Sequence, residues 1–167
     1  MCAWHAETMA GLVVPDPKLT GKLRGSPGLE NIGVCVGSYL GVPSAEVSEQ
    51  VRAFESRLEE EVAVMDAQFP KSESLNGKGL SATVRLAAWA HAEWIRIHPF
   101  ANGNGRTARM WANFLFMRYG LPPVIHLRPR PGGEYALAGS DAMKGSWKST
   151  EAVFLDMLKA ALFDKSS

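Results

Sequence analysis

The run of residues 98–109, which reads H-P-F-A-N-G-N-G-R-T-A-R, constrains this chain more than any other feature. Gly103 and Gly105 allow a tight turn with accessible backbone N–H groups, which together make a nest for an anion. A helix is expected to begin near Gly105, and it would add the positive end of its dipole. Arg106 and Arg109 are three residues apart, so they share one face of that helix. The segment therefore favours an oligophosphate ligand.

His98 stands at the entrance of this segment and is a side chain able to accept a proton near neutral pH. It follows an apolar run over residues 81–97 that predicts a buried helix, and Pro99 terminates that helix. A histidine, an anion nest and two arginines together favour transfer of a phosphorus-centred group to a nucleophile. The alternative interpretation is a glycine-rich connection between two helices that carries two surface arginines.

The segment resembles the signature loop of the Fic-domain family, H-x-F-x-[DE]-G-N-G-R-x-x-R, and departs from it at Asn102. A looser resemblance extends over residues 20–163. It implies a mainly α-helical fold, the Fic helical bundle, with a short β-hairpin flap near the active-site loop. It also implies that residues 1–167 form a single Fic domain, in which residues 1–20 are an N-terminal extension.

The same resemblance implies a nucleotidyltransferase that moves AMP from ATP to a Ser, Thr or Tyr hydroxyl of a target protein. His98 would deprotonate the hydroxyl, and Phe100 would hold the loop from beneath. Asn113 would support the loop, the alternative being an exposed polar residue. The groups expected to bind the nucleotide and its phosphates are Gly103, Asn104, Gly105, Arg106, Arg109 and Tyr135.

Residues 32–40 resemble the family's flap in position and composition. Their β-prone pattern places Val34 and Val36 on one face of a strand and Cys35 on the other. An exposed strand edge would hold a target segment by main-chain hydrogen bonds, which tolerate many side chains. The alternative is an irregular loop.

Asn102 occupies the position at which the family carries Asp or Glu to bind a phosphate-bridging Mg²⁺. An amide oxygen can coordinate Mg²⁺ but brings no negative charge, so Asn102 is a weak candidate ligand. The sequence therefore predicts Mg²⁺ as cofactor with ATP as co-substrate, but with weaker metal binding. Three alternatives follow: a feeble adenylyltransferase, a transferase with another phosphate-containing donor, and a non-catalytic module that binds a nucleotide or partner protein.

Many Fic proteins are restrained by a glutamate in an [ST]-x-x-x-E-[GN] helix that pairs with the second arginine, here Arg109. Residues 26–31 fit those letters through Glu30, but Pro27 and Gly28 oppose a helix. The sequence therefore leaves room for an inhibitory antitoxin chain as a second partner beside the target protein.

Charge and hydropathy exclude several other classes of protein. The formal net charge of +1 offers no basic excess for wrapping nucleic acid. No apolar run approaches the ~20 residues that span a bilayer, and the first residues do not resemble a signal peptide. Cys2 and Cys35 lack metal-ligand spacing and are expected to be reduced thiols. We expect a cytoplasmic protein without nucleic-acid or membrane partners, and delivery to another cell is left open.

Apolar periodicity predicts further helices over residues 45–68, 106–119, 135–143 and 150–163. Ser44 and Ser81 are the predicted N-caps of the helices over 45–68 and 81–97. His91, inside the buried helix, is expected to have a structural, hydrogen-bonded role. Arg128 and Arg130 lie in a basic loop that could touch a nucleotide or target, although a solvated loop is favoured.

Overall fold

The computed structural model describes residues 1–14, 16–70 and 75–163 and consists mainly of helices. The helices are α1 (Cys2–Met9), α2 (Val47–Gln68), α3 (Gly77–Ile97), α4 (Asn104–Arg118), α5 (Glu134–Met143) and α6 (Lys148–Phe163), with short 3₁₀ turns at Pro17–Leu19 and Ser44–Glu46. The strands β1 (Cys35–Val36) and β2 (Tyr39–Leu40) form one small antiparallel sheet. The prediction of a mainly α fold with a short β-hairpin is confirmed.

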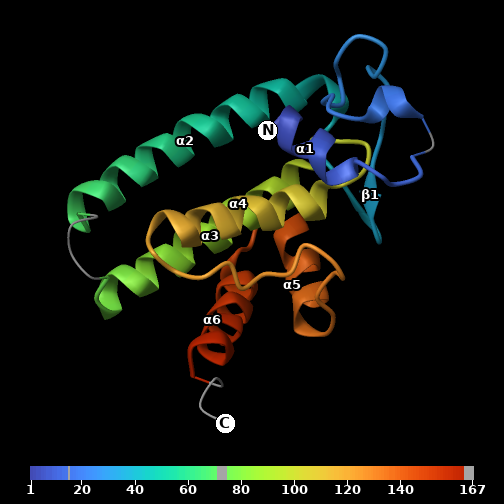
Figure 1. The fold of residues 1–167 in the computed structure, drawn as a ribbon. Helices are drawn as coiled ribbons and strands as arrows, with labels where there is room; N and C mark the ends of the chain where they lie inside the picture. The colour runs from blue at the N-terminus through green and yellow to red at the C-terminus, as the bar shows by residue number, and fades with distance from the viewer. Residues whose placement is uncertain (15, 71–74, 164–167) are drawn as a thin grey trace.

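Helix α3 lies at the centre of the fold, beside α4, with α2 along one side and α5 and α6 on the other (Figure 1). Every side chain in its middle, over residues 86–92, is buried, and all of these except His91 are apolar. Its small side chains, among them Ala87, Ala88 and Ala90, are fully buried and allow neighbouring helices to approach closely. This packing fixes the end of α3, and therefore the position of His98.

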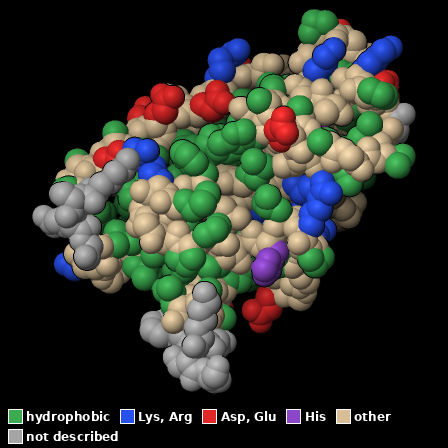
Figure 2. All heavy atoms as spheres, viewed as in Figure 1, with side chains coloured by type: hydrophobic (Ala, Val, Ile, Leu, Met, Phe, Trp, Pro, Cys, Tyr) green, Lys and Arg blue, Asp and Glu red, His purple; other side chains and the backbone are tan. Residues whose placement is uncertain are grey.

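Helix α2 buries one stripe and exposes the rest of its surface. The buried members of the stripe are Val47, Val51, Phe54, Leu58 and Met65, at spacings of three, four and seven residues. Acidic side chains gather on the exposed surface along α2 (Figure 2). The amphipathic pattern predicted over residues 45–68 is therefore confirmed. In the described part of the chain, no helix combines the length and the apolar character that crossing a membrane requires.

Both predicted N-caps are wrong. Helix α3 begins at Gly77 rather than near Ser81, because the side chain of Asn76 accepts a hydrogen bond from the backbone N–H of Gly79 at 2.9 Å. Positions 71–74, which the sequence assigns to a loop, lie outside the described residues. Ser44 starts a 3₁₀ turn, and its hydroxyl donates to the carbonyl oxygen of Glu30 instead of capping α2.

The hairpin occupies part of the predicted flap. Cys35 pairs with Leu40 and Val36 with Tyr39, and the backbone N–H of Gly41 donates to the Val34 carbonyl oxygen at 3.0 Å. Val34 and Val36 are half-buried and Cys35 is exposed, which confirms the predicted alternation. The strands have two residues each, so the regular pairing is shorter than the nine-residue segment named from the sequence.

Candidate active site

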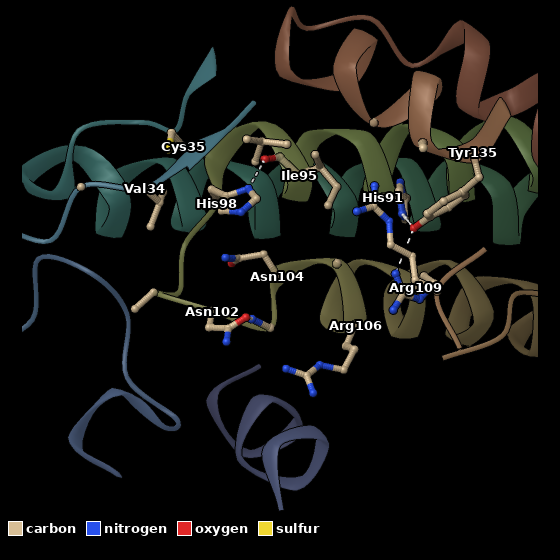
Figure 3. Close-up of a pocket in the computed structure, with 18 residues that line it drawn as sticks. Val34, Cys35, His91, Ile95, His98, Asn102, Asn104, Arg106, Arg109 and Tyr135 are labelled. Carbon is tan, nitrogen blue, oxygen red and sulfur yellow. Dashed lines mark hydrogen bonds between the residues drawn. The ribbon is translucent and has the colours of Figure 1, made fainter. Parts of the chain in front are cut away.

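A pocket of about 510 Å³ lies where the flap, the ends of α3 and α4, and α5 meet. One wall is a face of α3 that presents His91, Ile95 and His98, which are four and three residues apart. The opposite wall is the signature segment and the first turn of α4 (Figure 3). Every residue predicted to catalyse the reaction, bind the nucleotide or bind the metal lines this pocket.

His98 lies at the flap end of the pocket, beside Val34 and Cys35 (Figure 3). It caps α3 in the left-handed region, with φ 53°, and its Nδ1–H donates to the Ile95 carbonyl oxygen at 2.8 Å. Because a carbonyl oxygen only accepts, the proton is on Nδ1, and Nε2 keeps its lone pair. Burial lowers the pKa of His98; the bond to Ile95 raises it and the charge of Arg24 lowers it further. The imidazole is therefore neutral at physiological pH.

The signature loop is held from within by Asn104. Its side-chain oxygen accepts from the Phe100 N–H, and its side-chain N–H₂ donates to the Phe100 carbonyl oxygen, both at 2.8 Å. The Phe100 ring is fully buried beneath the loop, as predicted. Gly103, in the left-handed region with φ 79°, precedes α4, so the helix N-terminus opens onto the pocket. The side chain of Asn104 therefore shapes the signature loop, and any anion contact at this position would be made by the backbone.

His5 supports the same loop and was not singled out from the sequence. Its ring stacks on Phe100, with centroids 3.9 Å apart and planes at 13°. Its Nδ1 accepts from the Gly21 N–H at 2.8 Å, so Nε2–H donates to the Asn102 carbonyl oxygen at 2.9 Å. A side chain at Gly103 would place its Cβ 2.9 Å from His5 Nε2. No local pattern could have indicated this contact, since 97 residues separate His5 from Asn102.

Arg24 is the second supporting residue that sequence reasoning missed. It is 1% exposed, and its guanidinium donates to four backbone carbonyl oxygens. Those acceptors are His98 at 2.8 Å, Ile97 at 3.1 Å, Val42 at 2.8 Å and Ile32 at 3.1 Å. The cation thus satisfies the C-terminal carbonyl groups of α3 and joins them to both flanks of the flap.

Arg109, Tyr135 and His91 form the other end of the pocket (Figure 3). Arg109 is 4% exposed and donates from Nη1 to the Tyr135 hydroxyl at 3.3 Å and from Nη2 to the Leu127 carbonyl oxygen at 2.9 Å. His91 Nε2 and the Tyr135 hydroxyl share a hydrogen bond of 2.8 Å, which confirms the hydrogen-bonded role predicted for His91. Burial, with Arg109 and Arg130 nearby, lowers the pKa of His91 to about 3.

Arg106 also lines the pocket, but its side chain extends toward α1 (Figure 3). Its Nη1 donates to the Thr8 carbonyl oxygen at 3.3 Å, and its Nη2 contacts Met9 Sδ at 2.7 Å. Burial lowers its pKa, and so do the charges of Arg128 and Arg109. The shared helix face thus brings both signature arginines to the pocket, with Arg106 directed at α1 and Arg109 at α5.

Asn102 and Asn113 have different surroundings. Asn102 is exposed at the pocket, and its side-chain oxygen accepts from the Gly103 N–H at 2.6 Å. Asn113 is buried; it donates to the Ile125 carbonyl oxygen at 2.7 Å and accepts from the Ile125 N–H at 3.1 Å. Asn113 therefore supports the segment that follows α4 and not the signature loop itself. That segment includes Leu127, whose carbonyl oxygen accepts a hydrogen bond from Arg109.

Three histidines with lowered pKa values predict acid sensitivity; His5 and His91 are buried, and His98 is half-buried. Burial lowers the pKa of His5, His91 and His98, so the folded state stays neutral while the unfolded state takes up protons below about pH 6.5. Their contribution to stability is complete above that pH and is lost as the pH falls. We expect His91 alone to remove about 1 kcal/mol of unfolding free energy between pH 7.5 and 5.5.

Urea denaturation of the wild type and of His91→Gln at the two pH values measures this loss. His126→Gln, at an exposed position, is the matched control. If the wild type and His91→Gln lose the same free energy on acidification, His91 does not contribute in this way.

Comparisons with known proteins place the chain in one family. A model of the Fic/DOC family matches residues 1–116. Over 42 residues the chain is 60% identical to the protein adenylyltransferase Fic of Culex quinquefasciatus, which is 25% of this chain and 8% of that protein. It is 57% identical over the same length to the proteins of that name from Aedes aegypti and Drosophila melanogaster, again 25% of the chain and 8% of each relative. The match therefore spans less than a tenth of each of these relatives.

Proposed function

Because the chain belongs to the Fic/DOC family, we propose that it transfers AMP from ATP to a Ser, Thr or Tyr hydroxyl of a target protein. The observation that carries the proposal is His98, whose Nδ1–H is held by Ile95 and whose neutral Nε2 is available in a pocket that also contains a helix N-terminus and Arg109. The relatives named adenylyltransferases support it over a short stretch only.

His98 acts as the general base. Its Nε2 takes the proton of the incoming hydroxyl as the oxygen attacks the α-phosphorus and pyrophosphate leaves. The bond to Ile95 keeps the ring in one tautomer, and the four hydrogen bonds of Arg24 hold the chain on either side of it. Catalysis then depends on positioning the hydroxyl and the phosphorus against each other.

The nucleotide binds between the α4 N-terminus and α5. The dipole of α4 stabilises the charge that develops on the phosphate oxygens during transfer. Arg109 is a buried cation that is hydrogen-bonded to Tyr135 of α5, and it takes the outer phosphates. Tyr135 is 4% exposed and hydrogen-bonded to Arg109, so it orients that guanidinium as well as lining the nucleotide site.

The flap receives the target. Gly33, Val34, Cys35 and Val36 line the pocket beside His98, and β1 pairs on one edge with β2. A target segment that adds to the other edge of β1 by main-chain hydrogen bonds would carry its hydroxyl side chain toward His98. Selection of the target by backbone pairing would tolerate several sequences around the modified residue.

The magnesium ion that the family uses fits this pocket poorly. Mg²⁺ would neutralise phosphate charge, but its usual ligands are carboxylates together with phosphate oxygens. The described lining of the pocket includes no Asp or Glu, and the side-chain oxygen of Asn102 already accepts from Gly103. Binding, orientation and proton transfer therefore rest on the chain's own residues.

Restraint by a second chain remains part of the proposal. Glu30, the glutamate that fits the inhibitory motif, lies in a series of turns, where its carboxylate accepts from the Gly28 N–H at 2.8 Å. A partner such as an antitoxin would have to bring its own carboxylate to Arg109. The second candidate function, a module that binds a nucleotide or partner without transfer, is favoured by Asn102 alone.

Transfer of label from nucleotide to protein tests the function. The chain is incubated with a lysate and, separately, α-labelled ATP, GTP, UTP and CTP, with His98→Ala as control. We expect labelled protein bands with ATP that are absent with the control. Labelling with another nucleotide would replace ATP as donor, and equilibrium binding of ATP without any labelling would favour the non-catalytic module.

A further inference from the structure

We propose that this pocket binds the oligophosphate of its donor as a metal-free anion, with Arg106, Arg109 and Arg130 in place of a divalent cation. The proposal rests on the proposed function in taking a nucleotide as the ligand. It goes beyond that function in assigning Arg130 to the binding site and in changing what neutralises the phosphates.

The described lining of the pocket carries positive charge without a compensating carboxylate. Its charged side chains are Arg106, Arg109 and Arg130, and none of the ion pairs among the described residues involves any of them. Basic side chains are also visible on the surface between α1 and α5 (Figure 2). A pocket with this charge attracts an oligophosphate directly, whereas a metal complex of the same ligand carries less negative charge.

Arg109 provides the strongest reason for an anion here. A buried guanidinium is costly unless it is paired, yet its hydrogen-bond acceptors are the neutral Tyr135 hydroxyl and the Leu127 carbonyl oxygen. Its Nε has no hydrogen-bond partner among the described residues although the atom is buried. A phosphate oxygen would supply the missing acceptor and the missing charge together.

Arg130 stands beside Arg109 at the same end of the pocket. The two guanidinium carbons lie 6.0 Å and 5.9 Å from the centroid of the Tyr135 ring. Both arginines lower the pKa of His91, so their charges reach the same buried point. Arg130 is exposed, and its long side chain is able to fold over a ligand held by Arg109. The loop is exposed, as favoured from the sequence, and it also contributes Arg130 to the pocket lining.

Arg106 donates hydrogen bonds only to weak acceptors among the described residues. Its contacts are the Thr8 carbonyl oxygen at 3.3 Å and the thioether of Met9, both of them neutral. A phosphate offers stronger, charge-assisted hydrogen bonds, so we expect Arg106 to leave α1 for the ligand. Arg106 and Arg109 would then contact the oligophosphate from α4, and Arg130 would contact it from the segment before α5.

Because Asn102 is neutral, no metal ion is needed to separate this side chain from the phosphates. A carboxylate at this position would repel the phosphates unless a cation lay between them, which would make metal binding and nucleotide binding interdependent. The amide of Asn102 is neutral, and its side-chain oxygen accepts from the Gly103 N–H. The same reasoning predicts that Asn102→Asp introduces dependence on Mg²⁺ into nucleotide binding.

Isothermal titration calorimetry tests the proposal with two probes, ATP and inorganic tripolyphosphate, each in Mg²⁺ and in EDTA at constant ionic strength. For the wild type we expect the Kd of both probes in EDTA to equal that in Mg²⁺ or to be lower. For Asn102→Asp we expect removal of Mg²⁺ to weaken ATP binding by ~10-fold. Arg130→Gln should weaken tripolyphosphate binding by ~10-fold, and Arg52→Gln, which removes the same charge from an exposed position on α2 outside the pocket lining, should not.

The possible results are distinguishable. If EDTA weakens binding of both probes to the wild type by ~10-fold, the metal-free site is refuted and the proposed AMP transfer still stands. If Arg130→Gln and Arg52→Gln bind alike, Arg130 is not part of the site. If tripolyphosphate binds without metal but ATP does not bind at all, the metal-free site is supported and ATP fails as donor. If neither probe binds, both proposals fail.

Discussion

Replacing His98 with Ala should lower the rate of label transfer by ~10²–10⁴-fold, the usual contribution of a positioned general base. The nucleotide should still bind with a Kd within about threefold of the wild type, since we propose that Arg109, at the other end of the pocket, takes the outer phosphates. The imidazole is neutral because burial lowers its pKa, and the bond to Ile95 leaves Nε2 as its free nitrogen. Single-turnover labelling at saturating nucleotide measures the loss.

His126→Ala, which removes an exposed histidine, is the matched control and should transfer at the wild-type rate. A second comparison, His98→Gln, keeps a polar side chain but supplies no base at neutral pH. If His98→Ala retained more than a tenth of the wild-type rate, with folding verified by circular dichroism, proton abstraction by His98 would be refuted.

Replacing Arg24 with Met should lower the free energy of unfolding by about 3 kcal/mol, because it removes hydrogen bonds from several buried carbonyl groups at once. Those groups include the last carbonyls of α3, at Ile97 and His98, and the Val42 carbonyl that follows the flap. Methionine fills much of the same volume, so loss of packing contributes little. Urea denaturation at pH 7.5 measures the change.

Lys22→Met is the control, since Lys22 is exposed two residues away. We expect it to change the free energy of unfolding by less than about 0.5 kcal/mol. Transfer by Arg24→Met should fall even at temperatures where the variant is folded, because His98 and the flap lose their common support. A variant as stable as the control would show that the four carbonyl bonds of Arg24 do not hold the α3 terminus.

The sequence and the structure agree best where the relevant physics is local. Glycines at 103 and 105 and a proline at 99 allowed the turn after α3 to be predicted, and apolar spacing allowed α2 to be placed within two residues of its observed start. The N-cap of α3 was predicted at Ser81 instead of Asn76. Both side chains are able to cap a helix, and the residues after each of them are able to form one. Local signals identified the elements better than their exact ends.

Several features of the site depend on contacts that no window of sequence contains. His5 reaches Asn102 across 97 positions, and Arg24 reaches the His98 carbonyl oxygen across 74. Asn104 lines the pocket where its backbone was expected to face the phosphates, and the bonds of its side chain to the backbone of Phe100 were not foreseen. Asn113 was expected to support the signature loop, and it supports the segment after α4.

By itself, the sequence determined that the chain is helical, that His98 ends a buried helix, and that a glycine-rich turn with two arginines follows it. These conclusions rest on periodicity, turn residues and charge spacing, which act over a few positions. Only the tertiary structure decided the tautomer of His98, the direction of Arg106 and the place of Arg130 in the pocket. Those depend on which distant groups lie within hydrogen-bonding reach, and packing of the helices against α3 sets that.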